Sequence, residues 1–243
     1  LSLHWRGRQP KVIEITTYAE VVLAPVVNDL THPAFSNLFV QTELLADQEG
    51  ILCHRRPREP DEACPWLFHM TAIHGDVERQ TSFETDRAKF IGRGQTAADP
   101  LALRHPGPLS NTAGAVVDPV IAIRHRIRLK PGVPLVIDII LGVTAERELS
   151  LALLDKYRDH PIADRMFEMA SSHSQIALRQ INVNDEEADL FNRMAGSILF
   201  PARELRAEAE IILQNRRGQP SLWGYSLSGD LPIVLLSLSS SEN

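Results

Sequence analysis

Apolar and polar residues alternate along residues 1–145 with the period of a β-strand. Within residues 11–24, the apolar side chains fall on one parity and the polar side chains on the other. The apolar set is Ile13, Ile15, Ala19, Val21 and Leu23, and the polar set is Glu14, Thr16, Tyr18 and Glu20. Successive side chains of a strand point to opposite faces, so this pattern predicts a strand with one buried and one wetted face.

Further strand-like segments follow, separated by turns and polar loops. Residues 54–65 form a polar, Pro-rich loop, and Pro131-Gly132 marks a turn. The additional predicted strands cover residues 36–45, 66–76, 116–129 and 135–142. Many strands joined by turns, without a helical period between them, predict a β-sandwich for residues 1–145.

The hydrophobic period changes from that of a strand to that of a helix at Thr144. We expect Thr144 to cap a helix that carries the acidic Glu146 in its first turn. The apolar stripe of this helix is Leu149, Leu153 and Leu154. His160-Pro161 ends the helix, and Pro161 suits the first position of the next one.

Three more helices are expected before residue 215. The first runs to Gln180, and Asn184 with Glu187 forms a capping box that opens the second. Their apolar positions are Ile162, Met166, Met169, Ala170, His173 and Ile176, then Leu190, Phe191, Met194, Ile198 and Leu199. A last helix covers residues 201–214. Strands followed by helices define an α+β chain, with a helical linker at residues 146–214.

The overall composition excludes several classes of protein. Of the 243 residues, 44% are hydrophobic and 23% are charged, as in ordinary globular domains. The formal net charge of −6 argues against a general nucleic-acid-binding protein. No apolar run approaches the roughly 20 residues that cross a bilayer. Cys53 and Cys64 lie outside any CxxC pair, which favours two free thiols over a disulfide or a zinc site.

Nine histidines raise the question of a metal site. His69 and His74 have the closest ligand-like spacing, but an odd separation on a strand puts them on opposite faces. His125 lies on the apolar parity of its strand and is expected to be a hydrogen-bonded core histidine. We therefore predict no metal site and no resident cofactor.

Two groups of basic residues are candidate binding surfaces. Arg124, Arg126 and Arg128 share one face of a predicted strand, which favours a solvated or interdomain sheet face over a phosphate or nucleic-acid site. The second group surrounds Phe90-Ile91 and consists of Arg87, Lys89 and Arg93. A surface loop locked by salt bridges is the favoured interpretation. The alternative is an interface loop that reaches a neighbouring active site.

The segment at residues 215–236 concentrates side chains that suit a sugar ring. Aromatic faces pack on the C–H face of a sugar, while charged and hydroxyl groups pair with its hydroxyls. The candidate substrate-binding residues are Arg216, Trp223, Tyr225, Ser228 and Asp230. The alternative is that the Trp and Tyr are buried beside a Gly-Asp turn. The chain has no nucleophile elbow and no HExxH motif, so this segment is expected to contact the substrate rather than to act in covalent catalysis.

Six sequence blocks, in order along nearly the whole chain, carry a resemblance to a known family. They are residues 15–25, 32–40, 86–94, 114–119, 215–219 and 222–223 with 228–233. Together they resemble the phosphorylase-like C-terminal region of cyclic β-1,2-glucan synthases, which is similar to 1,2-β-oligoglucan, cellobiose and chitobiose phosphorylases. Ser226 replaces a glycine of the family pattern, which puts the local backbone in question because glycine allows positive φ.

The resemblance implies an architecture of a β super-sandwich, a helical linker, a catalytic α-helical toroid and a final β domain. This chain would supply the sandwich (1–145), the linker (146–214) and the start of the toroid region (215–243). Because the chain begins at Leu1 and stops at Asn243, both ends are expected to lie within a larger enzyme. The general acid of the family, an Asp, would then lie downstream of this chain, so no catalytic residue is assigned within it.

The implied chemistry is inverting phosphorolysis of β-1,2-glucan, with inorganic phosphate as cosubstrate. This chain would be a non-catalytic part, inactive alone, of an enzyme that controls chain length in cyclic β-1,2-glucan synthesis. Expected partners are β-1,2-glucan or a glucose oligosaccharide, the rest of the enzyme, and a second copy in a homodimer. The expected location is the cytoplasm. The alternative is that the whole enzyme is attached to the bacterial inner membrane. A free-standing carbohydrate-binding or dimerisation module is the alternative.

Overall fold

A computed structural model describes residues 1–57, 59, 62–199, 206–231 and 233. The chain divides into two compact units, residues 1–168 and residues 169–243, and each is described by itself. The first unit contains every strand of the described chain, and the second contains helices only. This order of strands followed by helices confirms the α+β class.

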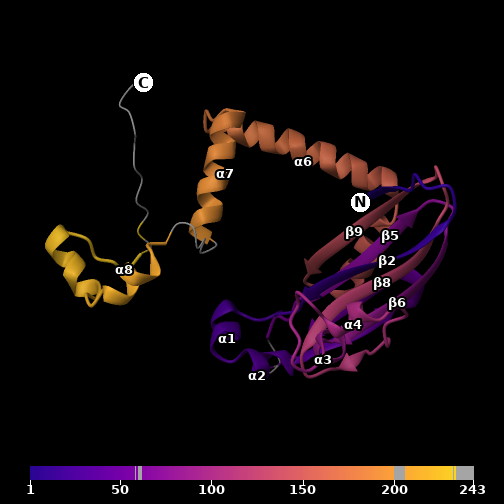
Figure 1. Ribbon diagram of the computed structural model, residues 1–243, viewed down its shortest axis with the longest axis horizontal. Coiled ribbons are helices and arrows are strands. Elements are labelled where there is room, and N and C mark those ends of the chain that lie inside the picture. The colour runs from indigo at the N-terminus through magenta and orange to yellow at the C-terminus, as the bar shows by residue number, and fades with distance from the viewer. Residues whose placement is uncertain (58, 60–61, 200–205, 232, 234–243) are drawn as a thin grey trace. The chain divides into compact units, whose positions relative to one another are not determined.

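The first unit is a sandwich of two antiparallel sheets (Figure 1). The smaller sheet has the order β2-β8-β6, and the larger has the order β1-β9-β5-β4-β3-β7. The strands are β1 (Ser2–His4), β2 (Lys11–Glu20), β3 (Val40–Leu45), β4 (Gly50–Arg55), β5 (Trp66–His74), β6 (Glu78–Asp86), β7 (Gly114–Ala115), β8 (Pro119–Leu129) and β9 (Pro134–Thr144). All pairings are between antiparallel neighbours, as expected for strands joined by turns.

The core between the sheets follows from the parity of the strand sequences. β2 pairs with β8 so that Ile13 lies opposite Ile127 and Ile15 lies opposite His125. The same parity of β8 carries further buried residues that meet the larger sheet. Two clusters fill this space, one with Val21, Val40, Ile51, Cys53, Phe83, Ile121 and Ile123, and the other with Ile127, Leu129, Leu135 and Ile137. The alternation that predicts strands therefore also identifies the core face.

The outer face of the small sheet is covered over part of its length, so the prediction of a wetted face is only partly right. The short helices α3 (Arg87–Ile91) and α4 (Leu101–Arg104) lie on this side. Their cluster consists of Phe90, Ile91, Leu109, Val120 and Ala122, with Tyr18 and Ala102 packed against it. β8 is consequently buried on both faces from Pro119 to His125.

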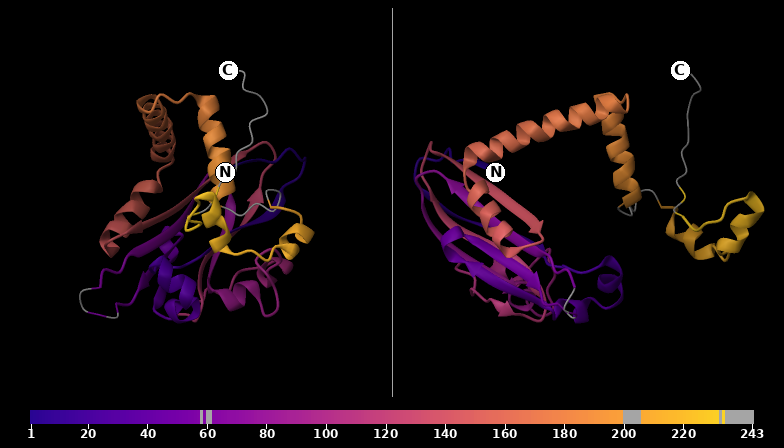
Figure 2. Two further views of the ribbon diagram at one scale, coloured as in Figure 1. Left: turned by 90° about the vertical axis from the view of Figure 1, so that its left-hand side faces the viewer. Right: turned by 180° about the vertical axis from the view of Figure 1, so that it is seen from behind.

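The outer face of the large sheet is covered by α5 (Arg147–Tyr157), which lies along the sandwich (Figure 2). Leu154 is fully buried against Leu52, Phe68 and Met70. Phe68 pairs with Gly142 across the strands, and a Cβ on Gly142 would lie 2.4 Å from the Phe68 ring. The absence of that side chain lets the ring lie flat on β9.

The predicted cap of α5 is wrong by two residues. Thr144 is the last residue of β9 and pairs with Trp66, so its backbone is held extended. Its hydroxyl donates to the Glu146 carbonyl at 2.7 Å, and Glu146 is the N-cap residue of the helix. Leu149, predicted to face the core, is 50% exposed, while Ser150 and Leu154 are buried.

The predicted strand at residues 36–45 is also partly wrong. Two short helices, α1 (Val26–Thr31) and α2 (Pro33–Asn37), precede β3, which begins at Val40. Pro33 occupies the first turn of α2. The Arg55 guanidinium donates to the Ser36 carbonyl at 2.9 Å and so holds the end of this helix against β4. The alternating pattern could not show that contact.

Helices α6 (His160–Gln180) and α7 (Asp185–Leu199) follow α5 and confirm that helices succeed the sandwich along the chain. The capping box is confirmed, because the Asn184 N–H donates to Glu187 and the Glu187 N–H donates to Asn184, both at 2.9 Å. α8 covers only Ala209–Gln214. The predicted last helix is therefore too long, since residues 206–208 are not helical and residues 201–205 lie outside the described chain. Among the described helices, none is long and apolar enough to cross a membrane.

Two histidines and one thiol lie inside the sandwich. His125 is 1% exposed and hydrogen-bonds to the hydroxyls of Thr71 and Thr81, which confirms the predicted core histidine. His69 bonds to Thr17 at 2.8 Å and to the Ile140 carbonyl at 2.9 Å. Cys53 is buried and unpaired, and burial raises the pKa of its thiol to about 12. Cys64 is a second free thiol, half-buried in the loop before β5.

Candidate functional site

The predicted sugar-contacting segment folds back on itself within the second unit. A 3-10 helix at Gln219–Tyr225 is followed by a turn that returns residues 228–230 to its start. The Gln219 amide donates to the Asp230 carboxylate at 2.7 Å and to the Ser228 carbonyl at 2.9 Å. The Trp223 indole N–H also points to the Ser228 carbonyl, at 3.4 Å. Trp223, Ser228 and Asp230 are therefore brought together, with Gln219 as the connecting residue that sequence reasoning missed.

The backbone at Ser226 explains the glycine of the family pattern. Ser226 ends the 3-10 helix in the left-handed region, with φ of 59°. Its N–H donates to the Trp223 carbonyl, and the next N–H donates to the Leu222 carbonyl. This is a helix-ending turn that glycine adopts without strain and that costs a serine on the order of 1 kcal/mol. The local shape is kept in this chain despite the substitution.

The aromatic side chains of this segment are exposed in the part of the chain that the structure describes. Trp223 is 62% exposed and Tyr225 is 72% exposed. Arg216 is exposed as well, and its neighbour Arg217 donates its backbone N–H to Asn215. Exposed aromatic and charged groups are available for contact with a sugar. Their assignment as substrate-binding residues remains a prediction.

The second candidate region is α3, where the basic side chains have different surroundings. The Arg87 guanidinium donates to Glu20 at 3.0 Å and lies 3.8 Å from Asp118. The Lys89 ammonium donates to the Thr112 hydroxyl at 2.8 Å, whereas Arg93 is exposed. Asp86 caps the helix by accepting from the Ala88 N–H. These bonds hold the segment on the sandwich, as the salt-bridge interpretation expects.

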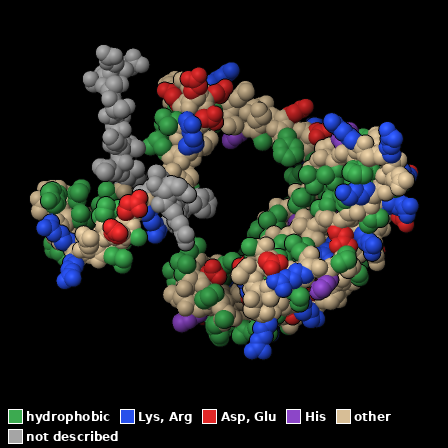
Figure 3. Space-filling view, in the orientation of Figure 1, with side chains coloured by type: hydrophobic (Ala, Val, Ile, Leu, Met, Phe, Trp, Pro, Cys, Tyr) green, Lys and Arg blue, Asp and Glu red, His purple; other side chains and the backbone are tan. Residues whose placement is uncertain are grey.

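Electrostatics at α3 follow from the Arg87–Glu20 pair. The hydrogen bond from Arg87 lowers the pKa of Glu20, and a second bond from Tyr18 acts in the same direction. Partial burial, together with the bond to Glu20, raises the pKa of Tyr18 to about 12. The Tyr18 ring stacks on the Phe90 ring, with 4.7 Å between the two ring centroids. Basic and acidic side chains are both scattered over the sandwich surface seen in Figure 3.

Arg124 does not lie on a solvated sheet face, which corrects that prediction. Its side chain is 3% exposed and donates to the carbonyls of Ala102 and Gly107 and to the Thr16 hydroxyl. Arg126 and Arg128 further along the strand are exposed. The three residues differ because the connection around α4 crosses only the end of the sheet where Arg124 lies. The backbone carbonyls of this connection, at Ala102 and Gly107, need hydrogen-bond donors, and Arg124 supplies them. A cavity of about 250 Å³ lies beside this connection.

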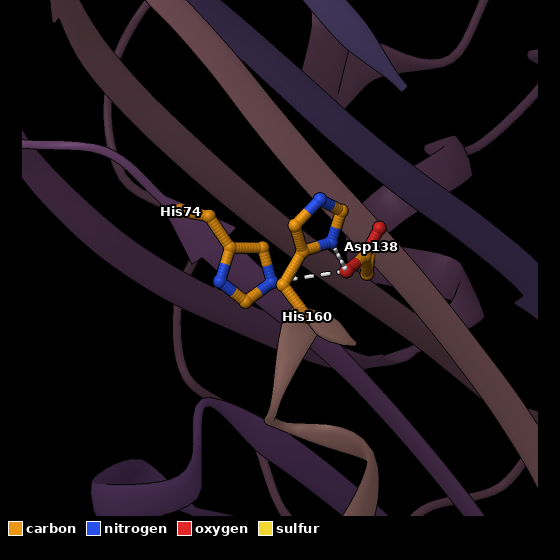
Figure 4. Close-up of side chains that lie close together, drawn as sticks. All are labelled: His74, Asp138 and His160. Atoms are coloured by element: carbon orange, nitrogen blue, oxygen red, sulfur yellow. Dashed lines mark hydrogen bonds and ion pairs between the residues drawn. The ribbon is translucent and has the colours of Figure 1, made fainter. Parts of the chain in front are cut away.

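A cluster that sequence reasoning missed joins the large sheet to the start of α6. His74 ends β5, Asp138 lies on β9, and His160 is the first residue of α6 (Figure 4). One carboxylate oxygen of Asp138 lies 3.0 Å from His74 Nε2 and 2.9 Å from His160 Nδ1. The hydrogen bond to Asp138 raises the pKa of His160. The strand register, with His74 opposite Val136 and Ala72 opposite Asp138, places His74 beside Asp138, and the third residue comes from the start of α6.

Comparison with known proteins agrees with this fold. Residues 1–160 match the family described as Glycosyl hydrolase 94, supersandwich domain. The chain therefore belongs to the glycosyl hydrolase 94 family through its supersandwich domain. Over 232 residues it is 31% identical to the cyclic beta-(1,2)-glucan synthase NdvB of Rhizobium meliloti (strain 1021). That match covers 96% of this chain but only 8% of the relative.

Proposed function

We propose that this chain is the non-catalytic N-terminal part of an inverting phosphorylase-like domain that acts on β-1,2-glucan. The observation that carries the proposal is the similarity to a cyclic beta-(1,2)-glucan synthase, which runs through the sandwich, the linker helices and the segment after them. On this proposal the enzyme is cytoplasmic and uses inorganic phosphate to shorten the glucan, and so helps to set its chain length.

Rows of exposed apolar side chains support the proposal that further protein covers this chain. On β9, the row that is buried at Leu135 and Ile137 continues as Ile139, Leu141 and Val143, which are 52–59% exposed. No residue of α6 is buried among those described, and its Phe167 is 76% exposed. Contiguous exposed apolar surface marks an interaction site. We assign these rows to contact with the remainder of the enzyme.

The chain alone should release no glucose 1-phosphate from β-1,2-glucan and inorganic phosphate. The proposed general acid lies downstream, and without it the glycosidic oxygen leaves unprotonated as phosphate attacks the anomeric carbon. A phosphorolysis assay on the purified chain tests this, with a longer polypeptide that continues beyond Asn243 as the positive control. Turnover by the chain above a heat-inactivated control would contradict the proposal. An inactive longer polypeptide would favour the free-standing module instead.

In the active enzyme, Asp230→Asn should reduce kcat/KM about 10- to 100-fold while leaving the melting temperature unchanged. A carboxylate that bonds to a sugar hydroxyl contributes on the order of 1.5–3 kcal/mol, and the amide keeps the size of the side chain. The matched variant is Gln219→Ala, which removes the donor that holds Asp230 but keeps the carboxylate. Equal losses in both variants, accompanied by lower melting temperatures, would show that Asp230 only braces the turn.

A further inference from the structure

We propose that His74, Asp138 and His160 form a binding site for a divalent transition-metal ion, with Zn²⁺ as the best fit. Each residue offers one ligand atom, and the three atoms lie within 4.8 Å of one another. Two imidazole nitrogens and one carboxylate oxygen are a common donor set for Zn²⁺ and its neighbours in the first transition row. Nothing in the proposed glucan chemistry requires this site, so the inference is independent of that function.

The three ligands come from elements that already converge. Asp138 lies opposite Ala72 and His74 lies opposite Val136, so the two side chains are diagonal neighbours on one face of the sheet. This is the face that α5 covers through Leu154, and the chain passes from α5 to α6 just beyond it. The rings of His74 and His160 stack with 4.7 Å between their centroids. His74 Nε2 and His160 Nδ1 are both directed at the same Asp138 oxygen (Figure 4).

A second carboxylate prepares His160 for a metal ion. Its Nε2 lies 3.7 Å from Asp164, one helical turn further along α6. Without an ion, the His160 proton on Nδ1 is shared with Asp138. When an ion takes the place of this proton, the neutral ring carries its proton on Nε2, which faces Asp164. Metal-binding histidines almost always donate their other N–H to a partner of this kind. An ion would then replace the protons that His74 and His160 share with Asp138.

The site is accessible without being fully exposed. The side chains of His74, Asp138 and His160 are 24%, 13% and 33% exposed. His74 also lines a cavity of about 250 Å³, from which water could complete the coordination sphere of the ion. A bound ion would link β5 and β9 to the first turn of α6, and we infer that it fixes the start of α6 on the sandwich.

Isothermal titration of the full chain with Zn²⁺ tests the site. We expect one ion per chain and a melting temperature that rises with Zn²⁺ concentration, because a ligand that binds only the folded state stabilises it. Mg²⁺ should not bind, since it prefers oxygen ligands. His160→Gln and Asp138→Asn should each weaken binding about 100-fold, and Asp164→Asn about 10-fold, as for partners of metal ligands.

Two matched variants separate this site from adventitious binding. His173→Gln, exposed on the same helix, and Cys64→Ser, at the accessible thiol, should bind Zn²⁺ like the wild type. Histidine ring signals in NMR spectra of the wild type give a readout that needs no variant, because His74 and His160 should shift with Zn²⁺ while His173 does not. Absence of saturable binding, wild-type affinity in His160→Gln, or loss of binding in Cys64→Ser would each overturn the proposal.

Discussion

Leu154→Ala should lower the free energy of unfolding of the sandwich by about 3 kcal/mol. Leu154 lies on the face of α5 that packs on the outer face of the large sheet. It is fully buried there against Phe68 and Met70. Truncation removes buried methyl groups and leaves a cavity that hydrogen-bonded strands cannot close. Urea denaturation followed by circular dichroism measures the loss, as a lower midpoint with an unchanged slope.

The matched control for this experiment is Leu149→Ala on the same helix. Leu149 is 50% exposed, so the change should cost no more than about 0.5 kcal/mol. Both variants replace leucine by alanine, and the difference between them therefore reports burial rather than helix propensity. Similar losses in the two variants would mean that α5 does not pack on the sheet as described.

Acid should weaken the sandwich between about pH 6.5 and pH 4 because His125 is buried in its neutral form. Burial lowers the pKa of His125 from 6.5 to about 4, with Glu49 opposing and Arg79 and His69 reinforcing the shift. Above pH 6.5 the histidine is neutral in the folded and unfolded states, and it has no effect. As the pH falls, the unfolded state binds a proton that the folded state does not, at a cost of about 3 kcal/mol by pH 4.

The test compares the stability of wild type and His125→Gln from pH 7 to pH 4. The variant should lose less stability over this range than the wild type, although its stability at pH 7 is lower because it disturbs the bonds to Thr71 and Thr81. His69 retains its own part of the acid effect in both proteins, since burial also lowers its pKa. His105→Gln, at an exposed position, serves as the control. Identical pH profiles for wild type and His125→Gln would contradict the prediction.

The strands and most helix positions could be predicted because each depends on the periodicity of its own sequence. The parity of residues 121–129 identified the core face of β8, and the Asn184–Glu187 box marked a helix start. Boundaries decided by contacts between distant segments could not be predicted. Pairing of Thr144 with Trp66 extends β9 into the expected helix, and Arg55 holds residues near Ser36 in a helix rather than a strand.

The same distinction separates the predicted from the missed site residues. Arg124, Arg126 and Arg128 are equivalent by parity, but only Arg124 meets the carbonyls of a connection that crosses the sheet. Similarly, the spacing of His69 and His74 did not predict the cluster around His74, because the partners of His74 come from β9 and α6. Sequence periodicity gives the face of each side chain, whereas its neighbours depend on strand register and loop paths.

The unequal surroundings of the two thiols allow the opening of the sandwich to be followed chemically. Cys53 is fully buried between the sheets, and the thiolate that reacts with alkylating reagents is disfavoured there. Cys64 lies in a partly exposed loop and should be modified first under native conditions. Once Cys64 is blocked, the rate at which Cys53 reacts reports how often the two sheets separate. That rate would measure the stability of the sandwich by itself, whereas denaturant curves of the chain also include the helical unit.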